Sequence, residues 1–178
     1  MANNTSPHED PYRANAVKGA LTPSKIVMMN PYWVAYVRLT TASTAGAIGH
    51  AMGDGFAKVM GALQSAGIAP SGPPLAAYHH FDDTETTFDV CLPIPKESIS
   101  AVIGVKTIET LGGEALRFVH KGPYGTLEHT YAVAMAELEA AGLTLKSPSY
   151  EIYVNDPGET PEDRLMTEIL MPIERRDE

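Results

Sequence analysis

The chain has 178 residues, of which 44% are hydrophobic and 20% charged, a composition that suits one globular domain and excludes general disorder. Its net charge of −9 favours neutral or cationic partners over phosphate backbones, so we expect no direct nucleic-acid binding. The sequence contains no long apolar run, no secretory signal pattern and a single cysteine, Cys91, which together predict a cytoplasmic protein without membrane contact.

The first segment, Met1–Lys25, is rich in Asn, Ser, Pro and Ala and has no clear apolar period. We expect it to form a poorly ordered extension. The folded domain is then predicted to occupy residues 26–178.

The chain repeats itself once. Phe56–Ile68 aligns with Tyr131–Leu143 at an offset of 75 residues (131 − 56), and the same offset places Tyr78 on Tyr153. Similar segments in the same order indicate two related halves, at about residues 30–95 and 114–173.

The first half is predicted to run strand, helix, strand, strand. Apolar residues recur at helical spacing before Gly67, which suits the position just after a helix. The candidates for the residue that caps the start of this helix are Thr41, Ser43 and Thr44. The predicted strands are Trp33–Leu39, Leu75–His80 and Thr87–Ile94.

The second half repeats this order. A tight turn at Gly122–Gly125 leads into a helix that ends at Gly142. The predicted strands are Ala115–His120, Tyr150–Val154 and Met166–Ile173. The segment Pro95–Gly113 links the halves, and a short strand is expected within it at Ala101–Val105.

Each predicted helix has one broad apolar face. Two strand-helix-strand-strand units joined edge to edge would bury both faces against one sheet. The sequence therefore predicts an α+β fold with a shared antiparallel sheet and a cleft at the pseudo-twofold axis, where a small molecule could bind.

Glu151 lies in an otherwise apolar strand, and the repeat places Ala76 at the equivalent position (151 − 75). A carboxylate present in only one half is not required by the fold. Burial raises the pKa of a carboxyl group and a cationic ligand restores its charged form, so Glu151 could select a ligand by charge or act as a general base. The alternative is a solvent-facing glutamate paired with a Lys or Arg.

Aromatic residues are candidates for the walls of the same pocket, because their faces attract cations. Tyr153 is two residues from Glu151 and so shares its side of a strand, and Tyr78 occupies the matching place in the first half. The further candidates are Trp33, Tyr36, Tyr124 and Tyr131. Of these, Trp33 and Tyr131 could instead fill the core, and Tyr124 could instead pack at the start of a helix.

Other reactive residues show no functional spacing. The histidines, including His79, His80 and His120, do not match a metal-binding pattern, and Cys91 is interpreted as a core thiol. Asp89 and Glu168 occupy equivalent places in both halves, which favours a structural or surface role. We therefore expect no metal and no cofactor.

Several motifs together resemble the GyrI-like small-molecule-binding family, whose fold is related to that of the SOUL family and which includes the effector-binding domains of AraC-type and MerR-type regulators. The matching segments are His120–Tyr124, Tyr150–Pro157, Thr160–Pro161 and Thr167–Ile173, with Gly72–Pro74, Tyr78 and Leu92–Ile94 in the first half. The resemblance implies a ligand pocket between the halves that contains Glu151. No pattern for a helix-turn-helix domain accompanies it.

Three functions follow from the resemblance, in this order. The first is a stand-alone module that binds hydrophobic, cationic or aromatic compounds for sequestration or sensing. The second is a hydrolase of cyclopropane-bearing or similar electrophiles, in which Glu151 is catalytic and Tyr78 or Tyr153 holds the leaving group. The third is a module that acts on a protein partner, such as gyrase or a regulator.

Overall fold

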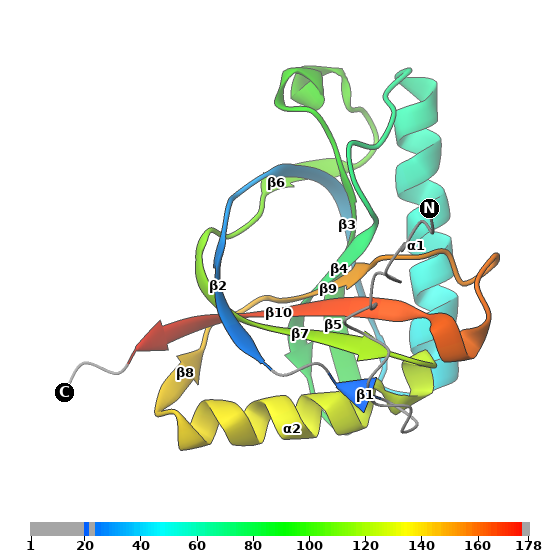
Figure 1. Cartoon of the computed structure of the whole chain (residues 1–178). Coiled ribbons are helices and arrows are strands. Elements are labelled where there is room, and N and C mark those ends of the chain that lie inside the picture. The colour runs from blue at the N-terminus through cyan, green and yellow to red at the C-terminus, as the bar shows by residue number, and fades with distance from the viewer. Residues whose placement is uncertain (1–19, 22–23, 176–178) are drawn as a thin grey trace, which may run out of the picture.

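A computed structural model describes residues 20–21 and 24–175 of the chain (Figure 1). Two α-helices are present in this part, α1 (Ala45–Ser65) and α2 (Leu127–Ala140), with three short 3₁₀ turns, η1 (Lys96–Ala101), η2 (Tyr124–Thr126) and η3 (Glu162–Arg164). The strands of the described residues are β1 (Ala20–Leu21), β2 (Lys25–Met29), β3 (Trp33–Ala42), β4 (Leu75–Phe81), β5 (Glu85–Pro93), β6 (Lys106–Glu109), β7 (Gly113–Lys121), β8 (Leu143–Leu145), β9 (Ser149–Tyr153) and β10 (Met166–Arg175).

All strand pairs in the described residues are antiparallel, and the sheet runs in the order β1-β7-β10-β9-β4-β5-β3-β6, with β2 also on β7 and β8 on β10. The second half of the repeat supplies β7, β10 and β9, and the first half supplies β4, β5 and β3. The two halves therefore meet where β9 pairs with β4, at the pseudo-twofold axis. This arrangement confirms the predicted α+β fold with edge-to-edge halves.

Helix α1 lies close against the sheet of the first half. Thr44 caps its start by accepting a hydrogen bond from the backbone N–H of Ala47 at 3.3 Å. Val59 and Leu63 are fully buried on its inner face. Gly55 permits the close approach, because a Cβ at this position would lie 2.9 Å from Cγ2 of Val90 in β5. The helix is followed by Gly67, whose φ of 68° is readily adopted by glycine.

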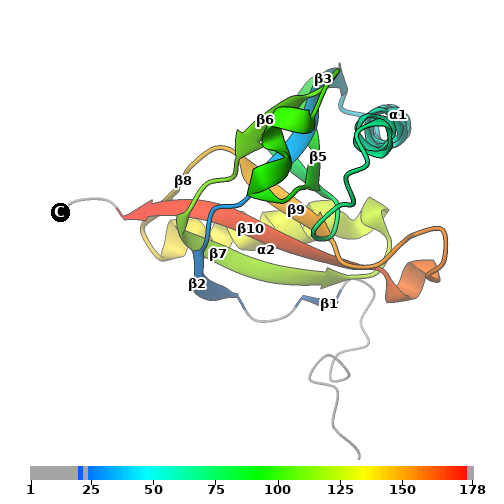
Figure 2. The same ribbon diagram turned by 90° about the horizontal axis from the view of Figure 1, so that it is seen from above.

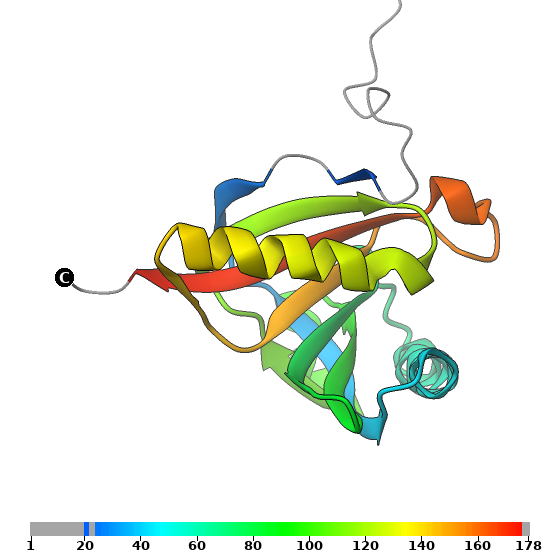
Figure 3. The same cartoon turned by 90° about the horizontal axis from the view of Figure 1, so that it is seen from below.

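Helix α2 covers the other half of the same face of the sheet (Figure 3). Its buried residues Ala134 and Leu138 pack in one cluster with Phe118 of β7 and Ile169 of β10. Directly opposed residues of neighbouring strands lie on one face, and the register links Ile169 to Glu151 and Glu151 to Ala76. The centre of the helix-covered face is therefore occupied by Glu151.

The opposite face of the sheet curls inward (Figures 1 and 2). Strands β2 and β3 lie near opposite ends of the strand order, yet only residues 30–32 connect them. Strands β6 and β7 also lie near opposite ends, and only residues 110–112 connect them. The two links are tied together: the N–H of Tyr32 donates to Oγ1 of Thr110 at 3.0 Å, and the N–H of Thr110 donates to the carbonyl of Tyr32 at 2.8 Å. A second apolar cluster fills part of this curled face and includes Val34, Leu75 and Tyr150.

The structure differs from the sequence prediction in the link between the halves and at both ends of the sheet. Ala101–Val105 forms no strand, because residues 96–101 form η1 and Gly104 has a φ of 87°; the strand of this link is β6, paired with the start of β3. The strand β8 was not predicted. Most of the predicted extension Met1–Lys25 lies outside the described residues, but Ala20–Leu21 and Lys25 belong to strands that pair with β7.

Candidate functional site

Strand β9 presents Glu151 and Tyr153 on the helix-covered face. Their side chains point to the same side because two residues separate successive positions on one face of a strand. Ala76, directly opposite Glu151, and Tyr78, two residues further along β4, share this face. The predicted pair of Tyr78 and Tyr153 therefore flanks the pseudo-twofold axis together with Glu151.

Glu151 is buried and is held by two phenol groups. Only 5% of the residue is exposed. The hydroxyl of Tyr131 in α2 donates to Oε1 at 2.8 Å, and the hydroxyl of Tyr153 donates to Oε2 at 2.8 Å. None of the ion pairs among the described residues includes Glu151. The alternative of a solvent-facing glutamate paired with a basic residue is therefore wrong.

Burial dominates the electrostatics of this cluster. Loss of hydration raises the pKa of the Glu151 carboxyl, while the hydrogen bonds from Tyr131 and Tyr153 oppose this by stabilising the carboxylate. Burial, followed by the nearby Glu151 carboxylate, also raises the pKa values of Tyr131 and Tyr153 well above the ordinary tyrosine value. The site thus contains an acid whose ionisation is disfavoured, surrounded by phenols that remain protonated.

Aromatic rings from both halves surround Tyr153. Phe56 of α1 contacts it edge to face, with 6.2 Å between ring centroids, and Tyr124 of η2 contacts it at 5.6 Å. The Tyr78 hydroxyl interacts with that of Tyr153, and its ring lies 5.3 Å from Phe88. Tyr124 is 37% exposed, so it forms the part of the cluster nearest to solvent.

Sequence reasoning missed Phe56, although the repeat contains the signal that identifies it. Phe56 aligns with Tyr131 at the offset of 75 residues (131 − 56). Each residue reaches the axis from the helix of its own half, Tyr131 toward Glu151 and Phe56 toward Tyr153. Selecting Tyr131 as a site residue would therefore have justified selecting Phe56.

Two of the predicted aromatic residues lie away from Glu151. Tyr36 packs with Val34, Leu75 and Cys91 on the curled face, because its position in β3 has the opposite parity. Trp33 packs against the cluster beneath α1, in a strand separated from β9 by β4 and β5. The structure therefore brings together Glu151, Tyr153, Tyr78, Tyr131 and Tyr124, and leaves Tyr36 and Trp33 in other parts of the core.

The acids shared by both halves form ion pairs on the curled face. Asp89 accepts hydrogen bonds from Nε and Nη2 of Arg38 at 2.7 and 3.0 Å and also contacts Nε2 of His79 at 2.7 Å. Glu168 accepts a hydrogen bond from Nε of Arg117 at 2.9 Å and forms an ion pair with its Nη2 at 2.7 Å. These ion pairs agree with the structural role expected for Asp89 and Glu168.

The remaining reactive residues have local partners. His120 is buried and contacts Oγ1 of Thr130 at 2.6 Å, and burial lowers its pKa. Cys91 is buried, and burial raises the pKa of its thiol. Within the part of the chain that the structure describes, no three His, Cys, Asp or Glu side chains are grouped to hold a metal ion. Neither described helix has the length and apolar character needed to cross a bilayer.

The fold and the site define a class of protein: a duplicated α+β domain with a carboxylate between its halves, enclosed by aromatic side chains. Comparison with known families agrees with this class. Residues 22–174 match the GyrI-like family, described as a GyrI-like small molecule binding domain, and the chain belongs to this family. No curated protein sequence matches it.

Solved structures show the same fold at low sequence identity. The C-terminal domain of EcmrR is 19% identical and superposes with a TM-score of 0.69 over 85% of this chain and 97% of that domain. SAV2435 bound to tetraphenylphosphonium is 14% identical, with a TM-score of 0.62 over 86% of this chain and 94% of that one. A hydrolase from Listeria innocua is 17% identical, with a TM-score of 0.58 over 85% and 91% of the two chains.

Proposed function

We propose that this chain binds hydrophobic, cationic aromatic compounds at Glu151, for sequestration or sensing. The observation that carries the proposal is a buried carboxylate, in a residue that is 5% exposed, that accepts hydrogen bonds from two tyrosines. None of the ion pairs among the described residues joins it to a basic side chain. An ionised carboxylate buried in this way lacks a compensating charge, which a cation can supply.

The surroundings of Glu151 favour an aromatic cation over a small hydrated one. Four tyrosines and Phe56 form the cluster that surrounds the carboxylate. The faces of such aromatic rings attract organic cations. A small metal ion would prefer several oxygen ligands, whereas this cluster offers one carboxylate and neutral phenols. The binding of tetraphenylphosphonium by SAV2435 is consistent with such a ligand.

A ligand must displace aromatic side chains to reach Glu151. Tyr131 and Tyr153 both donate to the carboxylate, and Tyr124 packs on the edge of Tyr153 at the exposed side of the cluster. Because Tyr124 is 37% exposed, its rotation together with Tyr131 would open a route from solvent. The cation would then replace one phenol hydrogen bond, and its charge would compensate for that loss.

The direct test is a binding titration with tetraphenylphosphonium by isothermal calorimetry, comparing wild type with Glu151→Gln. We expect affinity to fall at least about tenfold in the variant, equivalent to about 1.4 kcal/mol, because the amide keeps the shape but removes the charge. Glu128→Gln, an exposed change on α2, serves as the charge-matched control and should bind like wild type. Equal affinity of Glu151→Gln and wild type would overturn the proposal.

A second candidate is hydrolysis of a strained electrophile, favoured by the raised pKa of the Glu151 carboxyl beside two phenol hydroxyls. Glu151 would take a proton from water as the oxygen bonds to a cyclopropane carbon. The strained C–C bond would break into a conjugated acceptor of the substrate, which a tyrosine would protonate. Product formation from a cyclopropane-bearing compound, abolished in Glu151→Gln, would support hydrolysis; unchanged substrate after long incubation would contradict it.

A further inference from the structure

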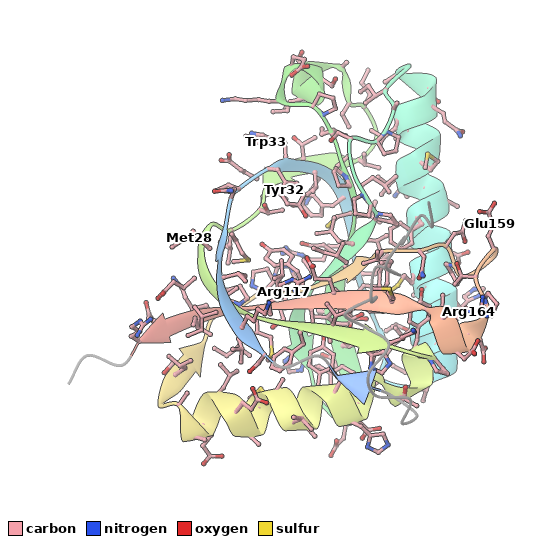
Figure 4. All side chains as sticks on the ribbon, in the orientation of Figure 1. Met28, Tyr32, Trp33, Arg117, Glu159 and Arg164 are labelled. Atoms are coloured by element: carbon pink, nitrogen blue, oxygen red, sulfur yellow. The ribbon has the colours of Figure 1, made fainter. Side chains whose placement is uncertain are left out.

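The curled face of the sheet encloses a cavity of about 360 Å³ that is separate from the Glu151 cluster. It lies between the sheet strands β7, β9 and β10 on one side and β2 with the two linking segments on the other. Figure 4 shows Met28, Tyr32 and Arg117 around the space over which β2 arches. Glu151 and Ile152 are consecutive in β9, so Ile152 faces this cavity while Glu151 faces the helices.

The walls of the cavity are mainly apolar and reach an exposed rim. Val27, Met28, Met29, Leu111, Ile152 and Leu170 supply the apolar surface. Met28 is 67% exposed and Leu111 36%. A volume of this size falls within the range of about 300–1,000 Å³ typical of small-molecule sites. Methionine side chains adapt to ligands of different shape, which suits a site of this composition.

The charges in the cavity compensate each other. Among its described lining residues, the charged ones are Arg117 and Glu168, which form an ion pair at 2.7 Å with 28% and 24% of their side chains exposed. A charged ligand would lose hydration on entry without meeting an uncompensated opposite charge. The cavity therefore favours an uncharged ligand, in contrast to the Glu151 cluster.

One hydroxyl in the wall can orient such a ligand. The oxygen of Tyr150 accepts a hydrogen bond from the backbone N–H of Leu111 at 2.9 Å. Because a phenol both donates and accepts, its own proton stays available for an acceptor atom on a ligand. Thr110 and Asn30 add further polar groups to the lining of the cavity.

We propose that this cavity is a second small-molecule site, selective for uncharged, largely apolar compounds that carry a hydrogen-bond acceptor such as a carbonyl. Hydrogen bonds between Tyr32 and Thr110 hold together the two linking segments that line the cavity. The site shares β9 and β10 with the Glu151 cluster but uses the other side of both strands.

The test uses Nile red, an uncharged fluorescent dye with a carbonyl acceptor, titrated against the full chain. Leu170→Trp fills the cavity, and Met28→Asp places a charge on its rim. We expect the first change to weaken dye binding about tenfold, because the indole occupies the space that the dye needs, and the second about threefold, because aspartate removes apolar contact area. Met135→Asp, at an exposed methionine on α2, is the matched control and should bind like wild type.

A second measurement locates the dye independently of the variants. In wild type labelled at the methionine methyl groups, nuclear Overhauser contacts from the dye should appear at Met28 and Met29 and be absent at Met135. Absence of dye binding by wild type, absence of contacts at Met28 and Met29, or contacts at Met135 would each overturn the proposal. Tetraphenylphosphonium titrated in parallel reports on the Glu151 site alone, so the two proposals can fail separately.

Discussion

The two halves of the chain share their strand order but differ at the axis where they meet. Glu151 in β9 lies directly opposite Ala76 in β4, so one half contributes a buried acid and the other a methyl group. By contrast, both halves carry an acid on the curled face, Asp89 and Glu168, and each is paired with an arginine. The repeated acids are compensated within the sheet, and the unrepeated acid is the one that we propose for ligand binding.

The largest effect is expected from making the halves alike at the axis. Ala76→Glu would place a second carboxylate beside Glu151, at a position with 0% exposure. Overpacking and the proximity of two buried acids should lower the free energy of unfolding by at least about 3 kcal/mol. Urea denaturation measures this change. A loss below about 1 kcal/mol would mean that the axis has room and solvent that the structure does not show.

A smaller effect should distinguish the two arginine pairs. The side chain of Asp89 is 3% exposed in the wild-type structure, and Arg38→Met leaves His79 as its remaining partner. This change should lower the free energy of unfolding by about 2–3 kcal/mol. The side chain of Glu168 is 24% exposed in the wild-type structure, so water can replace the arginine in Arg117→Met. The free energy of unfolding should therefore fall by about 1 kcal/mol or less. Urea denaturation of both variants at pH 7 gives the comparison, and equal losses would contradict it.

A small effect of opposite sign should come from Glu151→Gln in the absence of ligand. Burial raises the pKa of this carboxyl in the folded chain above its unfolded value, so the folded state binds the proton more tightly. Wild type should therefore lose stability as the pH rises from about 4.5 through the raised pKa, whereas glutamine does not titrate.

The expected result is a variant about 1 kcal/mol more stable than wild type at pH 8, with the difference vanishing near pH 4. Denaturation curves at a series of pH values test the sign. The variant Glu128→Gln, exposed on α2, serves as the matched control. A gap that widens toward acidic pH would show that the buried carboxylate is stabilised rather than destabilised.

The repeat in the sequence was enough to predict the fold, because apolar periodicity and glycine positions recur in both halves. It also located Glu151, since an acid within an apolar strand and without a counterpart is visible in the sequence alone. The register between strands was not visible. The partners of Asp89 and Glu168, and the contact of Phe56 with Tyr153, depend on which residues oppose each other across separate elements.

The elements that close the curled face were the least predictable. Strand β2 was not predicted, and its first residue, Lys25, fell in the predicted extension; β6 was displaced from its expected place. Both are short strands whose partners lie far away in the sequence, because β2 pairs with β7 and β6 pairs with β3. Tyr36 was assigned to the wrong surroundings for a simpler reason, because the parity of β3 directs it to the curled face.

Strand β9 has a consequence for any coupling between ligands. Its consecutive residues Glu151 and Ile152 form part of opposite surfaces, with one backbone between them. A movement of β9 by a single position would exchange the acid and the aliphatic side chain, so both surfaces constrain the same alignment with β4 and β10. A ligand that shifts this five-residue strand from one side must therefore alter the surface on the other side.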